Sequence, residues 1–168
     1  MIYKINNETI TLVITMIYGN KIKHIRERNN IKEKQIAEIL NISRSLYCDY
    51  EKENKTIPTK HLNTICNYLN VSFDYIFNFE NTKQYRKCHK TEKLDLNIIR
   101  KRLKELRKDH KITQEELGKI AGCSYGTIAG YEIGRYLISI PVLYKICKKY
   151  NISADYLLGR IEINKKIS

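Results

Sequence analysis

The sequence predicts an all-α protein built from two tandem five-helix domains. Residues 22–78 align without a gap on residues 103–159, at an offset of 81 positions, and many aligned pairs are identical or both apolar. In both copies the apolar residues recur at helical spacing, and capping residues precede most of the expected helices. Two copies of one compact unit predict that the chain carries out one activity twice.

The expected organisation has five parts, namely an N-terminal extension (1–18), a first domain (19–79), a linker (80–94), a second domain (95–160) and a basic tail (161–168). Domains of about 60 residues bury roughly 60% of their unfolded surface, which suffices for a small core. The linker is polar and basic without an apolar stripe. It is either flexible or partly an extension of the next helix.

The N-terminal extension has three interpretations. Residues 9–15 are rich in β-branched side chains, and a turn at Asn6-Asn7 would let them pair with residues 2–5 as a β-hairpin. The segment is otherwise a disordered extension, or translation begins at Met16, directly before the first repeat.

The first domain is expected to form helices near residues 19–29, 33–40, 43–52, 59–69 and 73–78. The second helix carries Ile36, Ala37 and Leu40 on one face, and Ser72 is placed to cap the last helix.

The second domain repeats this plan with clearer helix starts. The expected N-caps are Asp95, Thr113, Ser124, Ser139 and Ser153. The spacing of Thr113 and Glu116 is that of a capping box, in which each residue satisfies a backbone N–H of the other.

Composition favours a polyanionic partner. The net charge is +13 and the isoelectric point is about 9.5, which points first to nucleic acid and second to an anionic membrane surface. There is no apolar run of membrane-spanning length, no CxxC pair among the five cysteines and no catalytic sequence motif. We therefore expect a cytoplasmic protein that is not an enzyme, needs no metal or cofactor, and has no membrane partner, and the sequence implies no small-molecule ligand.

The second repeat carries a recognisable series of motifs. Thr113–Gly118 lies in one expected helix, and a tight turn at Gly122-Cys123 follows it. Ser124–Ile128 and Tyr131–Arg135 then mark the start and end of the next helix, and Asn151–Gly159 closes the repeat. This series resembles the phage-repressor and Cro-type (XRE family) helix-turn-helix transcriptional regulators, and the resemblance covers both repeats. In that family the second helix of the motif enters the DNA major groove, where base edges can be read.

The resemblance implies which residues contact DNA. In the first repeat they are Ser43, Arg44, Ser45, Asp49, Lys52, Asn54 and Lys55. In the second repeat they are Gln114, Ser124, Tyr125, Thr127 and Arg135. Each repeat also departs from the family pattern, the first at Glu33 and Asp49 and the second at Gly126 and Gly130.

The resemblance also implies a structural ion pair in each repeat. Arg26 with Glu51, and Arg107 with Glu132, occupy matching positions. The family places such a pair, partly buried, between the first and third helices.

The sequence therefore predicts a sequence-specific, double-stranded DNA-binding transcriptional regulator, by default a repressor of bacterial or phage origin. The chain would act as a covalent pseudo-dimer or as a homodimer, on direct or inverted half-sites. The alternative is an antitoxin-like protein-interaction module, in which one or both domains bind a protein partner and no longer bind DNA specifically.

Overall fold

The computed structural model describes residues 18–79 and 92–163, and all regular secondary structure in these ranges is helical. In chain order the helices are α2 (Tyr18–Arg28), α3 (Glu33–Leu40), α4 (Arg44–Glu51), α5 (Thr59–Leu69), α6 (Phe73–Ile76), α7 (Leu96–Asp109), α8 (Gln114–Ala121), α9 (Tyr125–Glu132), α10 (Ile140–Tyr150) and α11 (Ala154–Leu157). The all-α prediction is confirmed. The β-hairpin interpretation of the N-terminal extension lies outside the described residues.

Local side-chain hydrogen bonds cap several helices at the predicted residues. The Ser72, Ser124 and Ser153 hydroxyls each accept from the backbone N–H three residues on, and the Asp95 carboxylate accepts from Asn97. The capping box of Thr113 is complete in both directions. These bonds satisfy N–H groups that have no partner inside the helix, so each helix begins where the sequence predicts.

The prediction that the Ser139 side chain caps α10 is wrong, although α10 begins directly after Ser139 as expected. The Ser139 side chain makes no capping bond. Its hydroxyl instead accepts from the Tyr131 hydroxyl at 3.4 Å, and its backbone N–H donates to the same phenol oxygen at 3.3 Å. Pro141 in the first turn has no N–H to satisfy, which suits the start of a helix.

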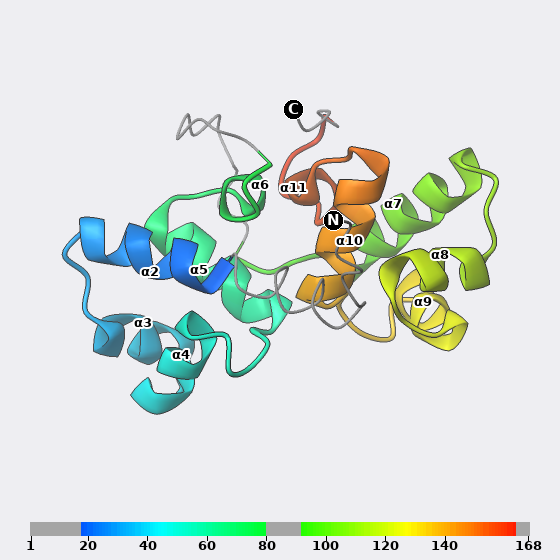
Figure 1. The fold of residues 1–168 in the computed structure, drawn as a ribbon. Coiled ribbons are helices and arrows are strands. Elements are labelled where there is room, and N and C mark those ends of the chain that lie inside the picture. Colours follow the sequence, from blue (N-terminus) through cyan, green and yellow to red (C-terminus); the bar gives the residue numbers. More distant parts are fainter. Residues whose placement is uncertain (1–17, 80–91, 164–168) are drawn as a thin grey trace, which may run out of the picture. The chain divides into compact units, whose positions relative to one another are not determined.

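The chain divides into two compact units between Ile57 and Pro58. In the first unit α3 packs against α4, and α2 contacts α4 (Figure 1). The second unit holds α5 to α11, in which α8 and α9 pack together, α7 contacts α9, and α6 contacts α11. The division falls inside the first repeat, and the repeat-based boundaries at 79 and 95 stay a prediction.

The same tight turn joins the motif helices in both repeats. Asn41 at φ 53° ends α3, and Gly122 at φ 72° ends α8. These left-handed conformations suit asparagine and glycine, which tolerate positive φ. After each turn the next backbone N–H returns to the helix, from Ile42 to the Ala37 carbonyl and from Cys123 to the Gly118 carbonyl. The turn fixes the start of α4 and of α9, which hold the candidate base-reading residues.

Within residues 18–79 and 92–163, no helix is long and apolar enough to cross a membrane. The same residues contain no cluster of three or more histidine, cysteine, aspartate or glutamate side chains that could hold a metal ion. Cys66 and Cys147 are buried on matching helices, and burial raises the pKa of the Cys147 thiol well above its usual value.

Candidate nucleic-acid interface

The first turn of α4 presents the expected reading residues to solvent. Ser43 caps the helix, because its hydroxyl accepts from the Leu46 N–H at 3.2 Å. Arg44 and Ser45 follow on the first turn, and both are exposed. A rigid, capped helix start with outward side chains has the geometry by which helix-turn-helix proteins read the major groove.

Arg44 is engaged in the structure by Glu33 at the start of α3. The guanidinium Nε donates to the Glu33 carboxylate at 2.8 Å, and the Nη2 atom lies 2.8 Å from the same oxygen. The Cys48 thiol donates to that oxygen at 3.2 Å. The bonds from Cys48 and Arg44 lower the pKa of Glu33, so the carboxylate is ionised. Arg44 must leave this partner before it can reach a base.

Asp49 is also paired with neighbouring side chains. Its carboxylate lies 3.4 Å from the Lys55 ammonium and accepts from the Asn54 side-chain amide at 3.4 Å. Lys52 ends α4 and is exposed. The structure thus brings Asp49, Asn54 and Lys55 together as one charge-balanced group. Asp49 therefore binds its neighbours in this structure, and the DNA contact that the resemblance implies for it stays a prediction.

The corresponding surface of the second repeat is less charged. Ser124 caps α9, and its hydroxyl lies 3.0 Å from the Thr127 hydroxyl. Tyr125 is 66% exposed, and Arg135 beyond the helix is exposed without an ion pair to any residue that the structure describes. This helix start offers hydroxyls and an aromatic ring where the first repeat offers an arginine.

The two glycines of α9 have different surroundings. A methyl group at Gly130 would lie 2.3 Å from the Tyr136 hydroxyl, whose ring packs edge-on against Tyr131. A methyl group at Gly126 would have no atom nearer than the Ser124 hydroxyl at 3.8 Å. Gly130 therefore makes room for Tyr136, whereas Gly126 leaves an open surface.

We expect Gly126→Ala to raise the free energy of unfolding by about 0.5–1 kcal/mol, because alanine favours the helix and meets no obstacle. Urea unfolding measures the change. Gly134→Ala is the control with opposite sign, since Gly134 lies at φ 73° and alanine is strained there. A loss of stability in Gly126→Ala would contradict the open surface at this position.

Each repeat contains the ion pair that the resemblance implies. Arg26 Nε donates to Glu51 at 2.6 Å, and Arg107 Nε donates to Glu132 at 2.6 Å. In both, a second guanidinium nitrogen donates to the other carboxylate oxygen. The two glutamate side chains are 3% exposed. Bidentate bonds of this kind are strong and orient both groups.

The two repeats complete the ion pair with different third partners. In the first, the Tyr47 hydroxyl donates to Glu51 at 2.5 Å. In the second, the position of Tyr47 is taken by Ile128, and the Gln114 amide donates to Glu132 at 2.9 Å. Gln114 therefore lies against the ion pair. The DNA contact that the resemblance implies for Gln114 stays a prediction.

The buried carboxylate predicts an acid-dependent stability. Burial raises the pKa of Glu132, but the bonds from Arg107 and Gln114 and the charges of Arg107 and Lys104 together outweigh it, and the net shift is downward. An unfolded glutamate titrates near pH 4.3, so the stabilisation is complete above that pH and is lost as pH falls through the lower, folded pKa. We expect the stability gap between wild type and Glu132→Gln to narrow as pH falls from about 6 to about 3. Urea unfolding at each pH measures this difference in stability. A difference that stays constant with pH would contradict a stabilising, ionised Glu132 carboxylate.

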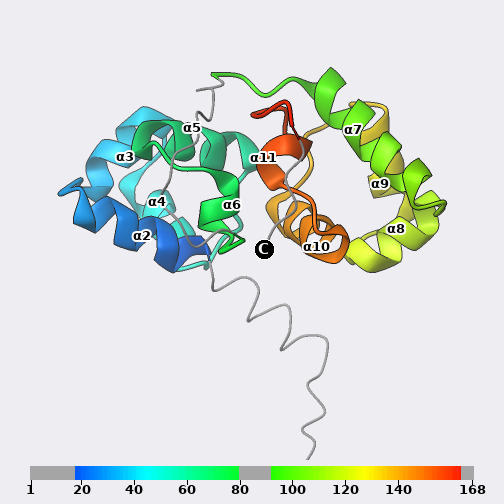
Figure 2. The ribbon, with the colours of Figure 1, turned by 90° about the horizontal axis from the view of Figure 1, so that it is seen from above.

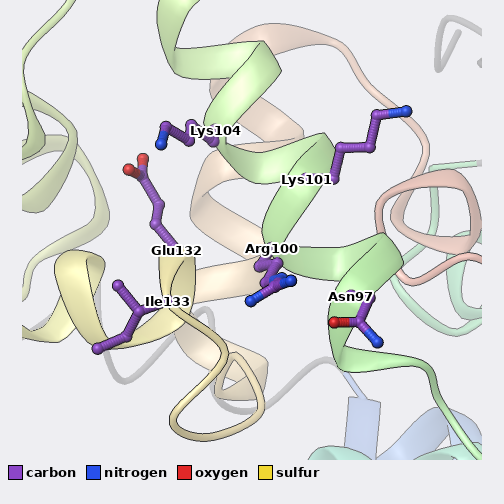
Figure 3. Close-up of a pocket in the computed structure, with 6 residues that line it drawn as sticks. All are labelled: Asn97, Arg100, Lys101, Lys104, Glu132 and Ile133. Carbon is purple, nitrogen blue, oxygen red and sulfur yellow. The ribbon is translucent and has the colours of Figure 1, made fainter.

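A basic surface pocket lies beside the ion pair of the second repeat. It has a volume of about 540 Å³ and is lined by Asn97, Arg100, Lys101, Lys104, Glu132 and Ile133. Figure 3 shows the Lys104 ammonium pointing toward the Glu132 carboxylate. Lys101 lies 3.9 Å from Glu105, one turn further along α7. The pocket adds positive charge next to α9, and the buried Glu132 carboxylate in its lining is already bonded to Arg107 and Gln114.

Sequence reasoning missed the partners of these side chains. The Glu33–Arg44 pair joins two residues that no sequence pattern connects, since Glu33 is a departure from the family pattern and Arg44 is an implied DNA contact. Arg160 was assigned no role, yet it is fully buried and pairs with Asp155 at 2.9 Å. The sequence does contain a sign of this role, because the second repeat ends in an arginine at the position where the first repeat has the apolar Phe79.

Comparisons with known proteins agree with this geometry. The helix-turn-helix domain family matches residues 19–82, and the helix-turn-helix family matches residues 103–157. An uncharacterised regulator of this type from Archaeoglobus fulgidus is 42% identical over 57 residues, which are 34% of this chain and 80% of the relative. The chain belongs to the helix-turn-helix (XRE-type) transcriptional regulators. It contains two such DNA-binding domains, and the family consists of regulators and not of enzymes.

Two other relatives match over part of their length. Antitoxin PezA of Streptococcus pneumoniae is 37% identical over 62 residues, or 37% of this chain and 39% of the relative. The regulator ImmR of Bacillus subtilis is 36% identical over 66 residues, or 39% of this chain and 52% of the relative. The chain thus spans about two fifths to a half of the length of these relatives. No solved structure shows a significant match.

Proposed function

We propose that this chain is a sequence-specific transcriptional repressor, in which α4 reads bases and both domains contact the DNA backbone. Repression follows from occupancy, because a protein bound over a promoter blocks polymerase. Lysine and arginine side chains displace counterions from the phosphates, and the first turn of α4 supplies the sequence readout. The family and the net charge of +13 support a DNA partner.

The observation that carries the proposal is the first turn of α4. Ser43 holds the helix start in place, and Arg44 is exposed directly after it. Arginine bonds the O6 and N7 atoms of guanine in the major groove, the commonest specific contact between protein and DNA. The pairing of Arg44 with Glu33 is exposed and therefore weak, so a guanine can replace the carboxylate.

The second repeat supports a different role. The Ser124 and Thr127 hydroxyls lie together at the start of α9, and Arg135 is an exposed cation beyond it, which supports contacts to phosphate oxygens. Tyr125 and the open Gly126 offer few groups for reading bases. We infer that the second domain contributes mainly backbone contacts, which position the chain without selecting sequence.

A protein partner for the second domain is the alternative. The observation in its favour is the group of exposed apolar side chains on and after α9, where Tyr125, Ile133 and Tyr136 are 66%, 57% and 42% exposed. Exposed apolar patches often bind proteins. The similarity of one domain to an antitoxin is consistent with this alternative.

The test is selection of random DNA duplexes by the whole chain at two salt concentrations. We expect one motif to be enriched at about 150 mM salt, with guanine at a fixed position. Binding that is unselective and disappears by about 200 mM salt would contradict the proposal, since it would reflect charge attraction alone.

A further inference from the structure

The second unit contains a buried polar contact between equivalent elements of the two repeats. Asp74 at the start of α6 and Asp155 at the start of α11 occupy the same repeat position and are 3% and 1% exposed. The Asp74 N–H donates to the Asp155 carboxylate at 2.9 Å. In return, the Ala154 N–H and the Ser153 hydroxyl donate to the Asp74 carboxylate. Each aspartate thus binds the helix start of the other repeat, and Figure 2 shows α6 beside α11.

A second exchange of equivalent positions flanks the first. Phe79 corresponds to Arg160, and Asn63 corresponds to Tyr144. The Phe79 ring stacks on the Tyr144 ring with centroids 5.2 Å apart, while Arg160 donates to the Asn63 side chain. Position 79 of the first repeat therefore meets position 144 of the second, and position 160 of the second meets position 63 of the first. Reciprocal contacts of this kind define a two-fold, isologous interface.

The two halves of this interface carry different chemistry. One half is aromatic, and the other is a buried cation, since Arg160 is 2% exposed and bonds Asp155 and Asn67 at 2.9 Å each. Pairing two first repeats would place Phe79 against Asn63, and pairing two second repeats would place Arg160 against Tyr144. In the first pairing Phe79 would lose the Tyr144 ring that it stacks on here. In the second, Arg160 would lose the amide oxygen of Asn63 that it bonds here. The interface therefore favours pairing of a first repeat with a second repeat over pairing of two identical repeats.

We propose that α5–α6 and α10–α11 form a built-in dimer interface, so that one chain is the complete DNA-binding unit. The proposal has two parts. The first is that the chain is a monomer whose two repeats pair with each other. The second, which rests on the proposed function, is that one chain binds an operator with two inverted, non-identical half-sites. We infer the inverted order only from the two-fold exchange between α5–α6 and α10–α11, because operator symmetry mirrors the symmetry of the protein. The half-sites differ because α4 presents Arg44 where α9 presents Tyr125.

The first part is tested without DNA, on the whole chain. Sedimentation should give a mass near 19.9 kDa at concentrations up to about 100 µM, since a closed interface leaves no concentration dependence. Asp74→Ala should speed hydrogen exchange of the Ala154 amide at least about tenfold, and Asp155→Ala should do the same for the Asp74 amide. Asp109→Ala, at an exposed aspartate on α7, is the matched control and should leave both amides unchanged.

Two results would overturn this part. One is a wild-type mass of two chains, and the other is unchanged exchange of both amides in the aspartate variants. If an aspartate variant fails to fold, Asn67→Ala is measured in its place. This substitution removes one hydrogen-bond acceptor of Arg160 at a position that is only half-buried. That variant should lower the melting temperature by several degrees, and no shift would count against the interface.

The second part is tested by titrating the selected duplex with the whole chain. One chain per duplex on inverted half-sites supports it. Two chains per duplex, or half-sites in direct order, overturn it. A chain that selects no sequence contradicts the proposed function, while sedimentation and hydrogen exchange still decide whether the interface exists.

Discussion

Glu132→Ala is expected to unfold the second helix-turn-helix domain or to lower its melting temperature by more than about 10 °C. The carboxylate accepts from two nitrogens of Arg107 and from Gln114, and its side chain is 3% exposed. Its removal leaves the Arg107 guanidinium, 16% exposed, without its counterion. Loss of one partner of a buried pair costs about 3–5 kcal/mol. A small domain of about 60 residues has a total stability of roughly 3–9 kcal/mol.

Thermal unfolding followed by circular dichroism measures this effect. Glu115→Ala is the matched control on the neighbouring helix, because Glu115 is 68% exposed and pairs with the exposed Lys119 at 2.8 Å. Such surface pairs contribute little, so the control should melt with the wild type. An unchanged melting temperature in Glu132→Ala would show that the ion pair does not hold α7 to α9.

The second large effect concerns the Glu33–Arg44 pair, whose two members should change DNA affinity in opposite directions. Arg44→Ala should weaken binding to the selected operator by about ten- to a hundredfold, because a bidentate contact to guanine is lost. Glu33→Gln should strengthen binding by up to about tenfold, because a negative charge near the phosphates disappears and Arg44 is released. Glutamine is tolerated at this position, as Gln114 in the second repeat demonstrates.

Fluorescence anisotropy with labelled duplexes measures both variants on the selected and on a scrambled sequence. Arg28→Ala is the control, because it removes an exposed arginine from α2 outside the proposed reading surface. It should weaken binding to both sequences slightly and equally. If Arg44→Ala behaves like Arg28→Ala, or if Glu33→Gln weakens binding, α4 of the first repeat does not read the operator.

The helices themselves were predictable because local signals and the internal repeat agree. Helices α3 and α5 have the predicted bounds, and the turns at Asn41 and Gly122 occupy matching positions. Each signal is local, since a cap or a left-handed turn depends on only a few neighbouring residues. Two copies of the same pattern provide an independent check of each assignment.

The side-chain partners were less predictable because they depend on how helices pack. Glu33 and Arg44 lie on different helices, and so do Gln114 and Glu132. Their pairing requires the angle between the helices and the rotamers of both residues, which a periodic pattern does not contain. The Asp74–Asp155 contact is a third case. The aligned aspartates were visible in the sequence, but their mutual contact depends on how α6 and α11 meet.

The measurement that tests the central claim most directly is the ratio of affinities of the whole chain for the selected and the scrambled duplex at about 150 mM salt. A specific regulator binds its site about a thousandfold or more tightly than other DNA. We predict a ratio of that size, and its reduction in Arg44→Ala. A ratio within about tenfold would contradict base reading by α4 and would favour a protein partner.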